Sequence, residues 1–318
     1  MTFLQILILA VTQGAAELLP VSSSAHVIVA EKLMGLNPTA PEMTLLLVML
    51  HAGTMLAVIV YFWSSWRTTY FSSVAAFRRN AVQVVLATGL TGVVGLALQK
   101  VIKTVFAKGA PDFEIEQLFG NAHLMAAALA SAGVLILVSS RLRDHPDGAL
   151  SLRAAAWIGA VQGLCLPFRG FSRSGATIST GMAAGVSRRQ SEEFSFALAV
   201  VLTPPVIVRE VLRLMKAPAA SAASASASAG AAPAVVGGAA DAVVATGTAA
   251  GSAAVAPAHA LLSGGLLHAL TPGLIGMVLS FLAGLLALVW LSRWLEHGRW
   301  GFFGVYCLLA SLLVLWVG

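Results

Sequence analysis

Long apolar segments restrict this chain to one class of fold. Because a helix needs about 20 apolar residues to cross the hydrocarbon core of a bilayer, each such segment predicts a transmembrane helix. Only 10% of the residues are charged and the mean hydropathy is +0.88, whereas soluble domains carry about 25% charged residues. We therefore expect an all-α integral membrane protein, a polytopic helical bundle in the bilayer. The long segments lie near residues 44–63, 82–101, 122–140, 194–215, 273–292 and 302–317.

A weak internal repeat organises the shorter apolar segments. The stretch "QGAAELLPVSSSAH" begins at Gln13, and "QGLCLPFRGFSRSGA" begins at Gln162. Both start with Gln-Gly, pass a Leu-Pro break and reach a serine-rich turn. Broken apolar segments in corresponding halves indicate a binding site where the halves meet. We expect one membrane domain over 1–318, with repeats over about 1–140 and 150–318. The shorter segments are 3–19, 24–36, 154–168 and 175–187.

One region departs from this pattern. Residues 217–260 consist almost entirely of small residues, and Asp241 is the only charged one. Pro233 and the Gly237–Gly238 pair disfavour a spanning helix. We interpret 217–260 as a low-complexity loop inserted between two membrane segments.

The basic residues indicate the orientation of the chain. The formal net charge of +6 is distributed over loops, and no basic run accompanies a soluble surface, so we expect no nucleic-acid binding. The segment 64–80 carries Arg67, Arg78 and Arg79 without an acid, and 141–153 carries three more arginines. Such loops favour the cytoplasm. The serine-rich stretch then approaches its site from the outer face.

The first broken segment gathers polar side chains at membrane depth. Gln13 and Glu17 are four residues apart, so they share one helix face. Ionisable residues inside a membrane are functional candidates. After the proline break, Ser22 or Ser23 is a natural N-cap for a second short helix. His26 falls on the same face as these serines, so a carboxylate, hydroxyls and an imidazole come to one turn.

The second broken segment predicts an anion site. Gly170 permits a tight turn, and Ser172 can cap a helix that begins near Arg173. The amides of its first turn, together with Ser174 and Thr177, form an anion-binding N-terminus. The guanidinium of Arg173 matches phosphate oxygens. It pairs with Glu17, or it awaits a ligand, or it does both at different times.

Together the two segments predict a site for a phosphate or a pyrophosphate. A hydroxyl, a base and a second titratable group supply the means to attack it. A carboxylate beside a diphosphate normally needs a divalent cation between them, so Glu17, with Gln13, predicts Mg²⁺ or Ca²⁺.

The two segments "QGAAELLPVSSSAH" and "FRGFSRSGATIST" resemble the signatures of the undecaprenyl-diphosphate phosphatase, or bacitracin-resistance, membrane family. The resemblance implies hydrolysis of undecaprenyl diphosphate to undecaprenyl phosphate and inorganic phosphate, which recycles the lipid carrier for peptidoglycan synthesis. It also implies inverted repeats with two re-entrant broken-helix segments. The location it implies is the bacterial inner membrane, with the active site facing the outer, periplasmic side and the bilayer and the lipid as partners.

The resemblance implies a role for each residue of this sequence that matches a position of the family motifs. Which of Ser23 and His26 attacks phosphorus stays open, and Ser23 is favoured. The sequence departs from the motif at Arg169, which stands where the family has Pro, so a second cationic contact is one reading of it. The expected catalytic residues are Glu17, Ser23, His26 and Arg173. The expected substrate-binding residues are Gln13, Ser22, Arg169, Gly170, Ser172, Ser174 and Thr177.

A transporter or flippase of anionic polyprenyl lipids is the alternative, because inverted repeats and broken helices suit it equally. Transport does not require the trio of Glu17, Ser23 and His26, which favours the enzyme. We interpret Ser24 as satisfying backbone groups at the helix break, and His51 as a packing or supporting residue. The sequence leaves the oligomeric state open, with a homodimer among the options.

Overall fold

The computed structural model describes residues 1–36, 41–106, 121–143, 145–168, 170–205, 207–208 and 265–317. Within these ranges the regular structure is helical and no strand occurs, as predicted. The segment 217–260 and Arg169 lie outside the described residues. The helices are α1 Phe3–Leu18, α2 Ser23–Leu33, α3 Pro41–Tyr70, α4 Val74–Phe106, α5 Ala122–Ser140, α6 Leu152–Cys165, α7 Arg173–Ala183, α10 Gly265–Glu296 and α11 Trp300–Val317, with a further helix at 188–205.

Four of the described helices are long and apolar enough to cross a membrane. They contain the spans Leu45–Tyr70, Val74–Val105, Ala122–Ser140 and Thr271–Glu296. Helices α1 and α11 contribute shorter apolar stretches. The prediction of a multi-pass helical membrane protein is confirmed, and the last residues of the predicted segment 194–215 lie outside the described part.

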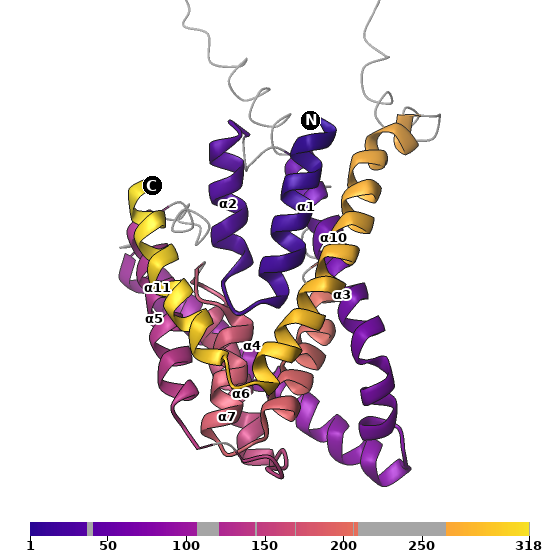
Figure 1. Cartoon of the computed structure of the whole chain (residues 1–318), viewed down its shortest axis with the longest axis vertical. Coiled ribbons are helices and arrows are strands. Elements are labelled where there is room, and N and C mark those ends of the chain that lie inside the picture. Colours follow the sequence, from indigo (N-terminus) through magenta and orange to yellow (C-terminus); the bar gives the residue numbers. More distant parts are fainter. Residues whose placement is uncertain are drawn as a thin grey trace, which may run out of the picture.

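The two interrupted segments form helical hairpins. Helices α1 and α2 lie side by side, and the turn that joins them at 19–22 is half-way down the molecule (Figure 1). Pro20 lacks a backbone N–H and cannot continue α1. Helices α6 and α7 pack against each other in the same way, joined by 166–172. The 11 residues of α2 and of α7 fall well short of the length of a spanning helix.

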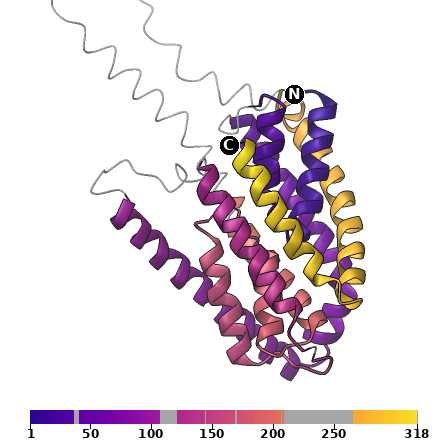
Figure 2. The same ribbon diagram turned by 60° about the vertical axis from the view of Figure 1, so that its left-hand side comes forward.

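Each hairpin packs against a long helix from the other half of the chain. Helix α1 contacts α10, and α6 contacts α4. Helices α5 and α11 lie along each other in both views (Figure 1, Figure 2). The apolar core fills the space between the hairpins and these helices, so the two halves interlock. Its large buried side chains include Leu18, Ile178, Phe196, Leu291 and Trp300.

A glycine permits the closest helix contact of the second hairpin. A Cβ atom on Gly159 of α6 would lie 2.3 Å from the carbonyl oxygen of Ala87 on α4. The Thr91 hydroxyl donates to the Gly159 carbonyl at 2.9 Å. Small residues allow helix backbones to approach in this way within membranes. Any side chain at this position has to push α4 away.

We expect Gly159→Leu to lower the melting midpoint of the purified protein in detergent, because forced overpacking costs about 1–3 kcal/mol or more. The matched control is Gly92→Leu on α4, where an added Cβ meets no atom within 4 Å. Equal midpoints for the two variants would contradict the close α4–α6 contact.

Candidate active site

The carboxylate of Glu17 is the centre of a partly buried polar network. Glu17 occupies the last turn of α1, and 9% of its side chain is exposed. Its Oε1 accepts a hydrogen bond from Arg173 Nη2 at 2.6 Å. Its Oε2 accepts from the Ser23 hydroxyl at 2.6 Å and from Gln13 Nε2 at 3.2 Å. The break between α1 and α2 therefore brings an acid and a hydroxyl together, as the sequence predicts.

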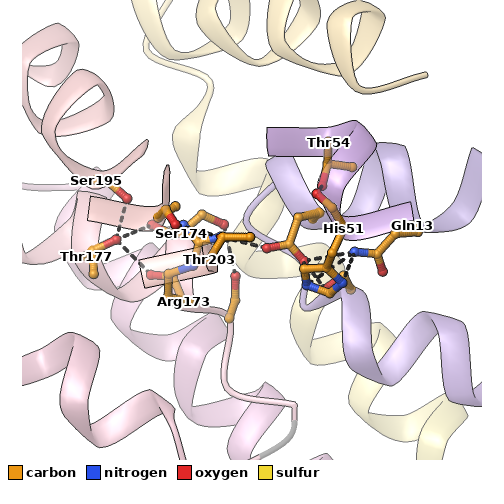
Figure 3. A network of polar contacts seen from close by, with 12 residues as sticks. Gln13, His51, Thr54, Arg173, Ser174, Thr177, Ser195 and Thr203 are labelled. Carbon is orange, nitrogen blue, oxygen red and sulfur yellow. Dashed lines mark hydrogen bonds and ion pairs between the residues drawn. The ribbon is translucent and has the colours of Figure 1, made fainter. Parts of the chain in front are cut away.

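Arg173 reaches Glu17 from the other half of the chain. The side chain of Ser172 accepts a hydrogen bond from the Gly175 amide and caps α7, which confirms the predicted start of this helix. Arg173 is the first residue of α7, so its side chain leaves the helix beside the N-terminal amides. Figure 3 shows Arg173 on one side of the network, with Gln13 and His51 on the other. Glu17 lies between the two sides.

The guanidinium of Arg173 keeps one nitrogen without a partner. Nη2 is bonded to Glu17, but the buried Nη1 has no hydrogen-bond acceptor among the described residues. A buried donor without an acceptor costs free energy. An anionic ligand at the start of α7 would satisfy this donor. The helix dipole also favours negative charge at this end of the helix.

A hydrogen bond from a side chain to a backbone carbonyl joins the tips of the two hairpins. The Ser174 hydroxyl donates to the Leu19 carbonyl at 3.2 Å. Gly170 adopts φ +101°, and a Cβ there would lie 2.3 Å from the Met125 carbonyl oxygen. This turn therefore needs glycine. Ser174 and Gly170 thus hold the second hairpin in place next to Glu17.

Thr177 faces away from the centre of the network. Its hydroxyl donates to the Arg173 carbonyl at 2.8 Å and shares a hydrogen bond with the Ser195 hydroxyl at 2.5 Å. Figure 3 shows Thr177 beside Ser195, on the far side of Arg173 from His51. In this arrangement Thr177 stabilises α7. Its predicted contact with substrate stays a prediction, as does that of Arg169.

His26 is held away from Glu17. Its Nδ1 lies 2.7 Å from the Ser22 carbonyl oxygen, and its Nε2 lies 2.7 Å from the Tyr306 hydroxyl of α11. Ser22 occupies the N-cap position of α2, but its side chain makes no capping bond. It shares a hydrogen bond of 3.3 Å with Ser24. The structure thus pairs Ser23 with Glu17 and assigns His26 to the turn.

His51 is the site residue that sequence reasoning placed only in a supporting role. Its Nε2 lies 3.3 Å from Glu17 Oε2, and its Nδ1 lies 3.0 Å from Gln13 Nε2. Its side chain is 42% exposed, so it forms the open edge of the network. An ionisable residue inside the long apolar segment 44–63 is the signal that could have identified it.

The oxygens of Glu17 and Gln13 are of the class that Mg²⁺ and Ca²⁺ prefer. Within the described ranges no group of three or more His, Cys, Asp or Glu side chains could hold a metal ion. Magnesium commonly binds one or two carboxylates together with substrate phosphates. The residues present therefore fit a cation that arrives with a diphosphate, and do not fit an all-protein metal cage.

These features define a polytopic helical membrane protein with a candidate anion site at the tips of two helical hairpins. The family model of the bacitracin resistance protein BacA matches residues 6–256. The chain belongs to this family.

Individual relatives match along almost the whole chain. The chain is 57% identical over 315 residues to "Undecaprenyl-diphosphatase 2" of Acinetobacter baylyi, covering 99% of this chain and 98% of the relative. It is 31% identical over 325 residues to "Undecaprenyl-diphosphatase 1" of Burkholderia pseudomallei, with 96% and 94% covered. It is 26% identical over 332 residues to "Undecaprenyl-diphosphatase" of Korarchaeum cryptofilum, with 99% of each covered.

We expect Glu17→Gln to lower the melting midpoint, because breaking this partly buried ion pair leaves an uncompensated charge, at a cost below the about 3–5 kcal/mol of a fully buried pair. Removing the Arg173 charge as well, in Glu17→Gln/Arg173→Gln, should restore part of the loss. The control is Glu296→Gln, which changes an exposed carboxylate at the end of α10. A double variant no more stable than Glu17→Gln would show that the two charges do not stabilise each other.

Proposed function

We propose that this chain hydrolyses undecaprenyl diphosphate to undecaprenyl phosphate and inorganic phosphate. This activity recycles the lipid carrier for peptidoglycan synthesis and so confers resistance to bacitracin. The observation that carries the proposal is the partly buried Arg173 guanidinium, which binds Glu17 with Nη2 and whose buried Nη1 has no hydrogen-bond partner among the described residues. The family and the names of the relatives support the same substrate.

The diphosphate binds where the two hairpins meet. Its oxygens accept hydrogen bonds from Arg173 and from the first-turn backbone amides of α7 other than that of Gly175, which already donates to Ser172. His51 forms the open edge of the site and contacts Glu17, so it meets the diphosphate from the opposite side. The polyprenyl tail stays in the bilayer, which explains why this polar site lies within an apolar bundle.

Ser23 is the favoured nucleophile, and Glu17 is its base. The Ser23 hydroxyl already donates to Glu17 Oε2 at 2.6 Å, within reach for direct proton transfer. The Ser23 oxygen attacks the terminal phosphorus while its proton passes to Glu17. The bond between the terminal phosphorus and the bridging oxygen breaks, and undecaprenyl phosphate leaves. Water then attacks the phosphoserine, the bond between phosphorus and the Ser23 oxygen breaks, and inorganic phosphate leaves. Glu17 returns its proton to the Ser23 oxygen, and the attacking water releases a proton to solvent.

A divalent cation, Mg²⁺ or Ca²⁺, accompanies the substrate in this proposal. Glu17 and Gln13 would hold it through their side-chain oxygens, together with phosphate oxygens of the lipid. When bound, the cation supplies positive charge that offsets the repulsion between the diphosphate and the carboxylate.

The hairpins are re-entrant segments of two inverted repeats in our proposal. The short helices α2 and α7 support re-entry, because neither is long enough to span a bilayer. The reciprocal packing of α1 on α10 and of α6 on α4 supports the repeat, since equivalent helices exchange places when inverted halves interlock.

The proposed location is the bacterial inner membrane, with the site open to the periplasm. One cavity lies between the end of α3, the end of α10 and the segment 187–190. Ser65, Arg188 and Glu296 are among the residues that line it. The arginine-containing segments 64–80, which the structure places mostly in the ends of α3 and α4, and 141–153 both reach this cavity. Their charge favours the cytoplasm for this end of the molecule. Both described chain ends lie at the opposite end (Figure 1). A homodimer stays a prediction.

The Ser23–Glu17 contact favours an enzyme over a transporter or flippase, because lipid transport needs no activated hydroxyl.

We expect Ser23→Ala to lose nearly all phosphate release from undecaprenyl diphosphate, about 100-fold or more, as removal of a nucleophile does. Ser24→Ala is the matched control, because Ser24 bonds Ser22 and not Glu17; it should stay near wild type. Substantial turnover by Ser23→Ala would make His26 the nucleophile. No phosphate release by wild type with Mg²⁺ or Ca²⁺ would reject the hydrolase.

Removal of divalent cations with a chelator should abolish phosphate release, and added Mg²⁺ or Ca²⁺ should restore it, because Glu17 alone repels the diphosphate. The measurement is phosphate release in detergent after exhaustive chelation. Full turnover without a divalent cation would contradict the proposal that such a cation takes part, and would leave the proposed role of Arg173 unaffected.

A further inference from the structure

A tyrosine on the last described helix reaches the turn that carries Ser23. Helix α11 packs mainly along α5 and touches α2 at few positions (Figure 2). At one of these contacts the Tyr306 hydroxyl lies 2.7 Å from His26 Nε2, and the two rings stack at 5.6 Å with 13° between their planes. The next residue, Cys307, is buried, and its Sγ donates to the Pro20 carbonyl at 3.2 Å. Consecutive residues of α11 thus hold both sides of the α1–α2 turn.

The contacts of His26 define which ring nitrogen carries its proton. Nδ1 lies 2.7 Å from the Ser22 carbonyl oxygen, which can only accept a hydrogen bond. In the neutral imidazole Nδ1 is therefore the donor and Nε2 the acceptor. The Tyr306 hydroxyl then donates to Nε2. The Ser22 carbonyl thereby fixes the tautomer, and the Tyr306 hydroxyl helps to hold the orientation of the imidazole.

The anchored imidazole holds a backbone conformation that is otherwise unfavourable. Ser22 has φ +66°, and among the described residues it is the only one other than glycine with positive φ. Such a conformation persists only where its surroundings hold it. The Ser22 carbonyl accepts from His26 Nδ1 and also from the His26 amide at 3.4 Å. The following residue, Ser23, presents its hydroxyl to Glu17 at 2.6 Å.

We propose that Tyr306 is a positioning residue, which acts through His26 and the Ser22 turn to hold Ser23 against Glu17. Three successive contacts connect them: Tyr306 to His26, His26 to the Ser22 carbonyl, and the Ser22 peptide to Ser23. Arg173, which binds the diphosphate in the proposed function, lies on the other hairpin, and its position does not depend on these three contacts. Tyr306 therefore affects the attack on phosphorus more than the binding of the lipid.

The test uses Tyr306→Phe in the full-length protein, which keeps the stacked ring and removes only the hydroxyl. We expect kcat for phosphate release to fall roughly 3- to 10-fold, the worth of one hydrogen bond, with KM for undecaprenyl diphosphate and the melting midpoint unchanged. The control is Tyr61→Phe on α3, whose ring packs against Phe62. An unchanged kcat, or a loss that follows a lower melting midpoint, would overturn the proposal.

A double-variant cycle separates positioning from a general structural role. If Tyr306 acts through His26, then Tyr306→Phe causes no further loss in a His26→Ala background, because coupled residues are not additive. A loss by the same factor in both backgrounds would mean that Tyr306 acts independently of His26 and would overturn the proposal.

A spectroscopic measurement decides the matter where His26→Ala has no residual turnover. The chain has 7 histidines, and the ring ¹⁵N signals of His26 are those that disappear in His26→Ala. Wild type should show the tautomer protonated at Nδ1, and Tyr306→Phe should shift the Nε2 signal. An unshifted Nε2 signal would overturn the proposal. The kinetic arms rest on the proposed phosphatase activity, whereas this measurement does not, so the two failures are distinguishable.

Discussion

The ion pair between Glu17 and Arg173 is the interaction on which the site depends. The two residues are 156 positions apart and come from different hairpins. Charges at this depth are costly unless they are paired, so the pair requires the two hairpins to meet tip to tip. The same pair leaves the other guanidinium nitrogen, Nη1, without an acceptor in the part of the chain that the structure describes. The meeting of the two hairpins and the proposed binding site for an anion thus depend on the same contact.

The fold serves this contact by interlocking the halves of the chain. Helix α1 lies on α10 and α6 lies on α4, so neither hairpin can move without disturbing the other half. Close approach at Gly159 fixes the second hairpin. Backbone groups freed at the breaks find partners: Leu19 accepts from Ser174, and Pro20 accepts from Cys307. Such compensation is what makes irregular backbone tolerable inside a membrane.

Much of this arrangement could be predicted from the sequence, because its signals are local. The apolar segments, the Leu-Pro breaks and the Ser172 cap have short-range causes, and the pairing of Arg173 with Glu17 was one of two options that charge allowed. Apart from this pair, contacts between distant segments are not predictable from the sequence. Nothing near His26 in sequence indicates Tyr306, 280 residues away. The sequence predicts only a packing or supporting role for His51, whereas the structure places its Nε2 atom 3.3 Å from Glu17 Oε2. Thr177 shares the motif, but the turn of α7 directs it inward to Ser195.

The central claim is that the diphosphate of a polyprenyl lipid binds to Arg173 at the meeting point of the hairpins. Direct binding of undecaprenyl diphosphate to a protein that cannot turn it over tests this claim most directly. We compare Ser23→Ala with Ser23→Ala/Arg173→Ala in lipid nanodiscs. Loss of a buried charged hydrogen-bond donor should weaken binding about tenfold or more, since such bonds contribute about 1.5–3 kcal/mol. Equal affinities for the two proteins would contradict the account.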